Sequence, residues 1–285
     1  STFNCIVSLG RTVGVRYPGT RIIMVTQTGD DHVGDVVCDF LEKNNVSSEG
    51  VYRKQNSQST VSLAFLDENN DAKYSFYRGR TSENEQLKFI DVKFNRGDIV
   101  VFGSYFAVNP ALREYTHALM KSAHDAGAII YYDVNYRKNH LSDLPVTRKY
   151  IEENIAMSDV VRASDEDIAC VFGNGDPDIV YRDIISSLCR NYICTKGGNP
   201  VSVYTASGTM EFPVPSVNTV STIGAGDNFN AGFVYGLIEN GIDKDNINSI
   251  PSSAWKDIVS IATKFSSNVC QSLFNYVDED FVKSL

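Results

Sequence analysis

The sequence predicts an α/β protein, with a mostly parallel central sheet, helices on both faces and a small β lid. Short apolar runs typical of buried strands alternate along the chain with stretches whose apolar residues recur at helical spacing. Connections long enough to hold a helix place successive strands parallel to one another. A single interruption, in which two β-rich runs are joined by a polar turn, predicts the lid.

The predicted strands and helices follow one another in order. Five apolar runs are predicted to be strands: residues 21–26, 98–102, 129–133, 158–161 and 192–195. After each of the first three runs, apolar residues recur at helical spacing, which predicts helices at residues 33–41, 110–126 and 147–157.

The interruption lies in residues 50–78. Residues 60–66 and 73–78 are rich in β-branched and aromatic side chains, and five polar residues join them. Such a hairpin is either an edge of the main sheet or a protruding lid. Polar alternation through its second strand favours the lid, so residues 1–49 and 79–285 are predicted to form the α/β domain.

Composition narrows the choice of partners and location. The formal charge is −9 with no dense basic cluster, which argues against nucleic acid or an anionic membrane as the main partner. No apolar run reaches the roughly 18–20 residues that span a bilayer. The six cysteines form no CxxC pair, which favours buried thiols in a reducing cytoplasm over zinc ligands or disulfides.

The chemistry is concentrated at Gly224-Ala225-Gly226-Asp227, where apolar residues at helical spacing begin. Unpaired amides at a helix N-terminus form a binding site for anions, and small residues let a phosphate approach them. A carboxylate in the first turn can accept a proton from an alcohol that attacks this phosphate. The alternative is a tight turn followed by an ordinary N-terminal helix charge.

The stretch from Ser221 to Phe229 resembles the second signature of the ribokinase-like (PfkB) carbohydrate kinases, D-T-x-G-A-G-D-x-F. The resemblance implies an ATP-dependent sugar kinase with Asp227 as catalytic base and Gly224, Ala225 and Gly226 as anion hole. No P-loop pattern is present.

Other segments extend the resemblance, and they are most similar to the fructokinase and 2-keto-3-deoxygluconate kinase branch. Asn4 resembles the end of a Gly-Gly-x-x-x-Asn element, residues 29–34 a G-D-D-x-x-G turn, residues 133–137 a D-x-N-x-R element, and Thr195 the start of a T-x-G element. Family members carry a strand with a substrate-binding Asp before the first of these, and this sequence does not contain it. The implied substrate-binding residues are Asn4, Arg78, Asn135 and Arg137. The implied nucleotide-binding residues are Thr195, Gly197 and Thr222.

Two departures concern the ions. Ser221 replaces the Asp of the signature at a position associated with a monovalent-cation loop, which puts activation by K⁺ in doubt. An N-x-x-E element linked to Mg²⁺ is replaced by Ser164-Asp165-Glu166-Asp167. Glu166 or Asp167 is therefore expected to act on a largely hydrated Mg²⁺ that accompanies ATP.

The substrate is left between two branches. Arg78 and Arg137 together would clamp a carboxylate, as a 2-keto-3-deoxygluconate kinase requires, whereas separate salt bridges would leave fructose as the substrate. Overall likeness places fructose first, and another sugar or a nucleoside is the further alternative. The resemblance also raises the possibility of a homodimer formed through the lid.

Two rivals come from other classes. A catalytically silent sensor or scaffold would show its loss of function most simply by lacking the base, and Asp227 is present. A nicotinamide-dependent oxidoreductase would need a G-x-G-x-x-G turn, which is not found.

Overall fold

The computed structural model describes residues 2–66, 72–77 and 91–285. The helices are α1 (Thr2–Arg16), α2 (His32–Lys43), α3 (Arg113–Asp125), α4 (Leu144–Met157), α5 (Asp165–Phe172), α6 (Pro177–Asp183), α7 (Ala225–Glu239), α8 (Ser252–Cys270) and α9 (Glu279–Ser284). The strands are β1 (Thr26–Gly29), β2 (Val51–Lys54), β3 (Val61–Leu66), β4 (Ala72–Tyr77), β5 (Ile99–Gly103), β6 (Ile129–Asp133), β7 (Val160–Ser164), β8 (Asn191–Lys196), β9 (Asn199–Thr205) and β10 (Gly208–Phe212). No helix in these ranges is both long and apolar enough to cross a membrane.

The main sheet has six strands in the order β10-β9-β8-β7-β6-β5. Strands β5 to β8 are parallel to one another, and β8, β9 and β10 pair antiparallel. The predicted strand at Ile129–Asp133 is confirmed at both ends, while β7 begins and ends later than expected. The sheet is therefore mixed, with a parallel half that brings the carboxyl ends of four strands to one edge.

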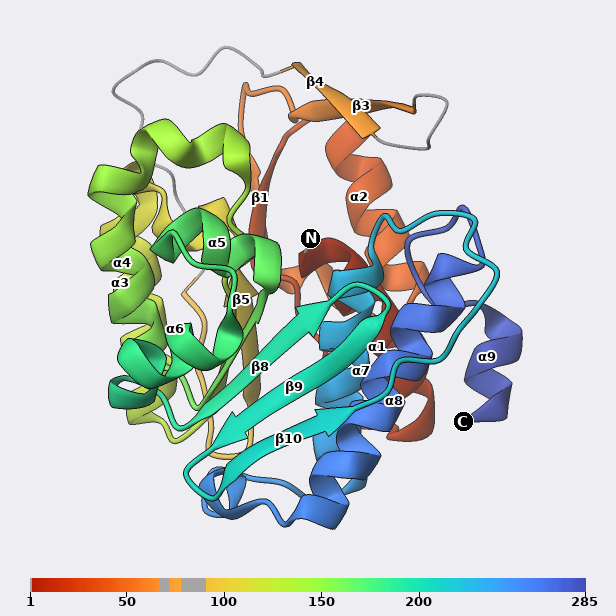
Figure 1. The fold of residues 1–285 in the computed structure, drawn as a ribbon. Helices are drawn as coiled ribbons and strands as arrows, with labels where there is room; N and C mark the ends of the chain where they lie inside the picture. The colour runs from red at the N-terminus through yellow and green to blue at the C-terminus, as the bar shows by residue number, and fades with distance from the viewer. Residues whose placement is uncertain (1, 67–71, 78–90) are drawn as a thin grey trace.

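Helices cover both faces of this sheet, as Figure 1 shows, with α3 to α6 on one side and α7 and α8 on the other. Side-chain alternation along β6 explains the two cores. Ile130 and Tyr132 pack with α3, α4 and α5, whereas Ile129 and Tyr131 pack with α7 and α8. All four side chains are essentially inaccessible to solvent.

Strands β1 and β2 form a separate parallel pair, next to helices α1 and α2. The strand predicted at residues 21–26 is displaced, because the regular ladder begins at Thr26 and Ile23 makes only an isolated bridge to Ser47. Ile22 is nevertheless buried in a core with α1 and α8, so the apolar run reflects packing rather than strand pairing. Helix α1 was not predicted.

The hairpin β3–β4 is a third, two-stranded sheet, separate from the six-stranded one. It lies beyond α2 at the top of Figure 1, and the turn that joins its strands lies outside the described residues. It is therefore not an edge of the main sheet. Strand β2, which the predicted lid boundary of 50–78 included, pairs with β1 instead.

Helices α7 and α8 are in unusually close contact at Gly232. A Cβ atom on Gly232 would lie 2.7 Å from the Cα of Ala262 and 2.9 Å from the Cβ of Phe265. The absence of a side chain at this position therefore fixes the distance between the two helix axes.

Candidate active site

The N-terminus of α7 forms the turn that the sequence singled out. Gly224 is the N-cap residue, and its φ of 83° lies in the left-handed region that favours glycine. The amide of Ala225 donates to the carbonyl oxygen of Thr222 at 3.2 Å, while Gly226 and Asp227 belong to the first turn, whose amides have no acceptor within the helix. This turn, residues 224–227, can bind an anion through its backbone and is named the anion turn.

Asp227 lies in the first turn of α7 and is 9% exposed. Its Oδ2 accepts a hydrogen bond of 2.8 Å from the Nδ2 of Asn4, at the start of α1. Burial raises the pKa of Asp227 above its ordinary value, whereas the bond from Asn4 lowers it. A partly desolvated carboxylate with a raised pKa is suited to accept a proton from an alcohol.

A buried polar network lies between the sheet and this turn. Arg162 on β7 donates from Nη1 to Oδ1 of Asp133 at 3.0 Å and from Nη2 to Oγ1 of Thr195 at 2.6 Å. The other oxygen of Asp133 accepts from Nδ2 of Asn230, one turn after Asp227 on α7, at 2.8 Å. The network therefore connects three parallel strands to the helix that carries the proposed base.

The nucleotide-binding predictions fall on three elements. Thr195 lies at the end of β8, where it accepts the hydrogen bond from Arg162. Gly197 follows in the turn to β9, and no atom lies within 4 Å of the position of a Cβ there, so its surface is open. Thr222 is exposed two residues before Gly224. Through Arg162, Thr195 is connected to the anion turn.

The substrate-binding predictions have different outcomes. Asn4 lies against Asp227, as described above. Asn135 follows β6, is 7% exposed and has a φ of 35°, a strained conformation that places it beside the carboxyl end of the sheet. Arg137 is exposed. Arg78 lies outside the described residues, so the pairing of the two arginines stays a prediction.

The two predicted metal-linked carboxylates lie in unlike surroundings. Asp167 is 3% exposed, and its Oδ2 accepts hydrogen bonds from the amide and the hydroxyl of Ser164 in a capping box. Burial raises the pKa of Asp167. In the described part of the chain, no group of three or more His, Cys, Asp or Glu side chains could hold a metal ion.

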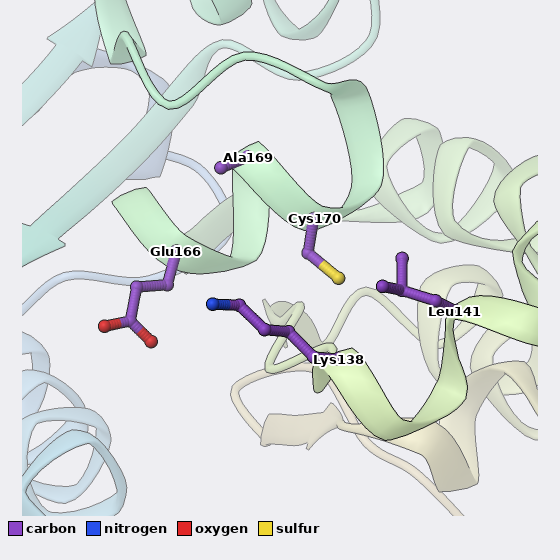
Figure 2. A pocket seen from close by; sticks show the side chains of 5 residues that line it. All are labelled: Lys138, Leu141, Glu166, Ala169 and Cys170. Atoms are coloured by element: carbon purple, nitrogen blue, oxygen red, sulfur yellow. The ribbon is translucent and has the colours of Figure 1, made fainter.

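Glu166 is exposed and lines a pocket of about 330 Å³ with Lys138, Leu141, Ala169 and Cys170. Figure 2 shows the amino end of Lys138 pointing toward Glu166. A cation therefore lies near each carboxylate, Lys138 beside Glu166 and Arg162 near Asp167, and the choice between the two as a contact for Mg²⁺ stays a prediction.

Ser221 is buried, and its hydroxyl accepts a hydrogen bond of 3.2 Å from the amide of Ile223. The amides of Val220 and Ser221 both donate to the carbonyl oxygen of Cys270. The serine thus stabilises the turn, and it brings no negative charge to a cation.

Sequence reasoning missed Arg162 and Asn230. The strand expected at residues 158–161 ends one residue before Arg162, and Asn230 follows the signature without a predicted role. A single arginine within the apolar run Val160-Val161-Arg162-Ala163 was the available signal, since a charged side chain in a central strand needs a buried partner.

Comparison with known proteins defines the class. The profile of the family described as pfkB family carbohydrate kinase matches residues 9–273. A fructokinase of Rhizobium leguminosarum bv. trifolii is 28% identical over 262 residues, covering 90% of this chain and 76% of that protein. Probable fructokinase-5 of Arabidopsis thaliana is 28% identical over 232 residues, covering 78% of this chain and 70% of that protein.

Solved structures agree on the fold. A fructokinase of Vibrio cholerae O395, in a form with bound fructose, ADP and calcium ion, has a TM-score of 0.81 at 18% identity, covering 99% of this chain and 89% of that one. An aminoimidazole riboside kinase of Salmonella enterica, complexed with aminoimidazole riboside and an ATP analogue, has a TM-score of 0.77 at 19% identity with the same coverage. The predicted ribokinase-like fold is confirmed.

The fold, and a helix N-terminus that holds a buried carboxylate beside small residues, are those of a carbohydrate kinase. The chain belongs to the pfkB family of carbohydrate kinases.

Proposed function

We propose that the protein transfers the γ-phosphoryl group of ATP to a hydroxyl group of fructose, with Asp227 as general base. The observation that carries the proposal is the position of this buried carboxylate in the first turn of α7, directly after Gly224-Ala225-Gly226. In this mechanism the carboxylate accepts the hydroxyl proton, and the turn's amides stabilise the charge that develops on the phosphoryl oxygens.

Asn4 and the network around Arg162 orient these groups. Asn4 donates to Asp227 and so favours the ionised form that accepts a proton. Asn4 and Asn135 are proposed to bind sugar hydroxyls, and Thr195, Gly197 and Thr222 to border the nucleotide. The fructokinases among the relatives support fructose over a keto-acid sugar.

Mg²⁺ is proposed to enter with ATP. Asp167 is proposed to contact this ion or its water, and the ion when bound would neutralise phosphate charge. Ser221 argues for weak activation by K⁺.

The hairpin β3–β4 is proposed to serve as the lid and as the contact between two copies of the chain. Leu63, Phe65 and Tyr77 share one face of it, and their exposed fractions are 43%, 57% and 60%. Exposed apolar side chains grouped in this way are typical of a protein interface. The six free cysteines support a reducing, cytoplasmic location.

A substrate panel tests the assignment. ADP release would be measured with fructose, fructose 6-phosphate, 2-keto-3-deoxygluconate, ribose and aminoimidazole riboside, with and without added KCl. Fructose is expected to have the highest kcat/KM, with little dependence on K⁺. A higher value for another member would replace fructose, and a preference for 2-keto-3-deoxygluconate would support the arginine clamp.

A further inference from the structure

The guanidinium group of Arg162 lies directly behind the anion turn. A Cβ atom built on Gly226 would lie 3.0 Å from Nη2, 3.1 Å from Nη1 and 3.4 Å from Cζ of Arg162. These three distances show that the guanidinium packs against the Cα of Gly226. A side chain at this position would make a contact tighter than usual, and the guanidinium would have to move by a few tenths of an ångström to admit it.

The position of this guanidinium is restrained on its other sides. Its bonds to Asp133 and Thr195 come from two different neighbouring strands, and its side chain is only 9% exposed. Nε is buried and has no hydrogen-bond partner in the part of the chain that the structure describes. The guanidinium is therefore held in place by Asp133 and Thr195, and one of its donors, Nε, stays unpartnered among the described residues.

The charge of Arg162 persists at every working pH. Burial lowers the pKa of Arg162, but the carboxylates of Asp133 and Asp167 raise it, and the net result lies above the ordinary value. A fixed positive charge in a poorly solvated site acts more strongly than one in water, and it needs no reorganisation during the reaction.

We propose that Arg162 is a positioning residue for phosphoryl transfer, which supports Gly226 from behind and supplies the positive charge toward which the anion turn is oriented. The inference rests on the proposed function of that turn. Arg162 acts through Gly226 and need not touch the nucleotide or the sugar. Its effect is greatest when negative charge develops on the transferring group, so it should appear in kcat rather than in KM.

The competing explanation is that Arg162 only neutralises Asp133. Removing the arginine alone would then harm the enzyme by leaving a carboxylate buried without its partner. Comparing Asp133→Asn with Asp133→Asn/Arg162→Gln removes this ambiguity. Both variants lack the carboxylate of residue 133, and they differ only at residue 162.

The test is steady-state kinetics with the best sugar of the panel, supported by thermal unfolding. Loss of a preorganised transition-state interaction typically lowers kcat by ~10²–10³, so Asp133→Asn should exceed the double variant in kcat by at least about tenfold. The KM values for ATP and sugar should differ by less than about threefold between the two. A smaller difference in kcat, or a difference confined to KM, overturns the proposal.

Single variants provide the second measurement. Arg162→Lys should have a higher kcat than Arg162→Gln because it keeps the charge, and equal values overturn the role of the charge. Arg113→Gln is the matched control. Arg113 is equally buried, is bound to Asn154 and Glu153 between α3 and α4, and should affect unfolding but not kcat.

The failure of this inference is distinguishable from a failure of the proposed function. If the proposed function is wrong, wild type phosphorylates no sugar of the panel, and if only the base assignment is wrong, Asp227→Asn keeps the activity of wild type. If only the role of Arg162 is wrong, Asp227→Asn is inactive while the double variant is as active as Asp133→Asn.

Discussion

Asn4 and Asp227 are 223 residues apart in the sequence and are joined by a hydrogen bond of 2.8 Å. The bond connects the N-terminal turn of α1 to the N-terminal turn of α7, and the two helices pack side by side. The proposed base therefore obtains its environment from both ends of the chain, and neither end provides the site alone.

Replacing Asp227 by Asn should abolish turnover while the fold is kept. Loss of a general base lowers the rate by ~10²–10⁴, and asparagine has nearly the same shape. The measurement is kcat with the best sugar, together with ATP binding by calorimetry. Asp159→Asn is the control, because Asp159 is also largely buried but pairs with Lys244 away from the anion turn. A kcat above about a tenth of wild type for Asp227→Asn would exclude the base assignment.

The same substitution should stabilise the free protein at neutral pH. Burial raises the pKa of Asp227 on folding, so the contribution of this group to stability is complete below its ordinary pKa and is lost as pH rises through the raised value. Asp227→Asn removes that loss. Its Tm should exceed that of wild type at pH 7, and the difference should disappear as the pH falls toward about 4. A lower Tm at pH 7 would contradict this.

Substitutions at Asp167 and at Glu166 should differ in how much they raise the Mg²⁺ concentration needed for activity. Asp167→Asn removes a buried charge but can still accept hydrogen bonds from Ser164, so the concentration of Mg²⁺ needed for half-maximal activity should rise about 10–100-fold. Glu166→Gln, an exposed change on the next residue, should leave it nearly unchanged. The measurement is a Mg²⁺ titration at fixed ATP, and a larger effect at Glu166 would reverse the assignment.

Asp31 should hold the base of the hairpin through Ser59. The carboxylate of Asp31 accepts bonds from the amide and hydroxyl of Ser59 at 2.8 and 2.7 Å and caps α2 at Gly34. The bonds from Ser59 and Gly34 lower the pKa of Asp31 to about 2. This stabilisation is complete above the ordinary pKa and is lost as the pH falls toward about 2.

Asp31→Asn should therefore lower the Tm at pH 6, and the difference from wild type should shrink below about pH 4. The exposed neighbour Asp30 provides the control, because Asp30→Asn removes the same charge. The carboxylate of Asp30 makes a long ion pair of 3.7 Å with Arg53, and no hydrogen bond between Asp30 and Ser59 is found in the described part of the chain. Equal shifts for the two variants would mean that charge alone is responsible.

Phe65→Asp should convert a dimer into a monomer. A charge placed on the apolar face of the hairpin opposes burial against a second copy, whereas Val146→Asp changes a similarly exposed residue on α4 and should have no effect. Light scattering coupled to gel filtration gives the mass directly. A wild-type protein that is monomeric at all concentrations would contradict the dimer.

Local pattern was enough to predict much of the fold. Ile129–Asp133 was predicted at both ends because an apolar run flanked by turn residues has one simple interpretation. The start of α7 was equally clear, because small residues precede an apolar helix. The strand predicted at residues 21–26 was displaced because the apolar side chain of Ile22 packs against α1. The spacing of residues within the segment does not reveal such a distant contact.

The site was predicted where its residues are adjacent and missed where they are brought together by the fold. Gly224 to Asp227 form one turn, so a short motif describes them. Arg162 reaches the same turn from a strand more than sixty residues earlier, and only the pairing of β6, β7 and β8 reveals the contact. The apolar residues around Arg162 indicate that its charge is buried, but they do not indicate which residues it contacts.

The contact of Gly232 with Ala262 limits how this protein can change over evolutionary time. Any side chain at this position would push α7 away from α8, and α7 carries Asp227 one and a half turns earlier. A substitution at this buried position would then displace the proposed base, which lies on the same helix. The close packing of the two helices therefore limits which substitutions at Gly232 are selectively neutral. For the same reason, an attempt to stabilise the enzyme by filling out its helices with alanine should leave this glycine in place.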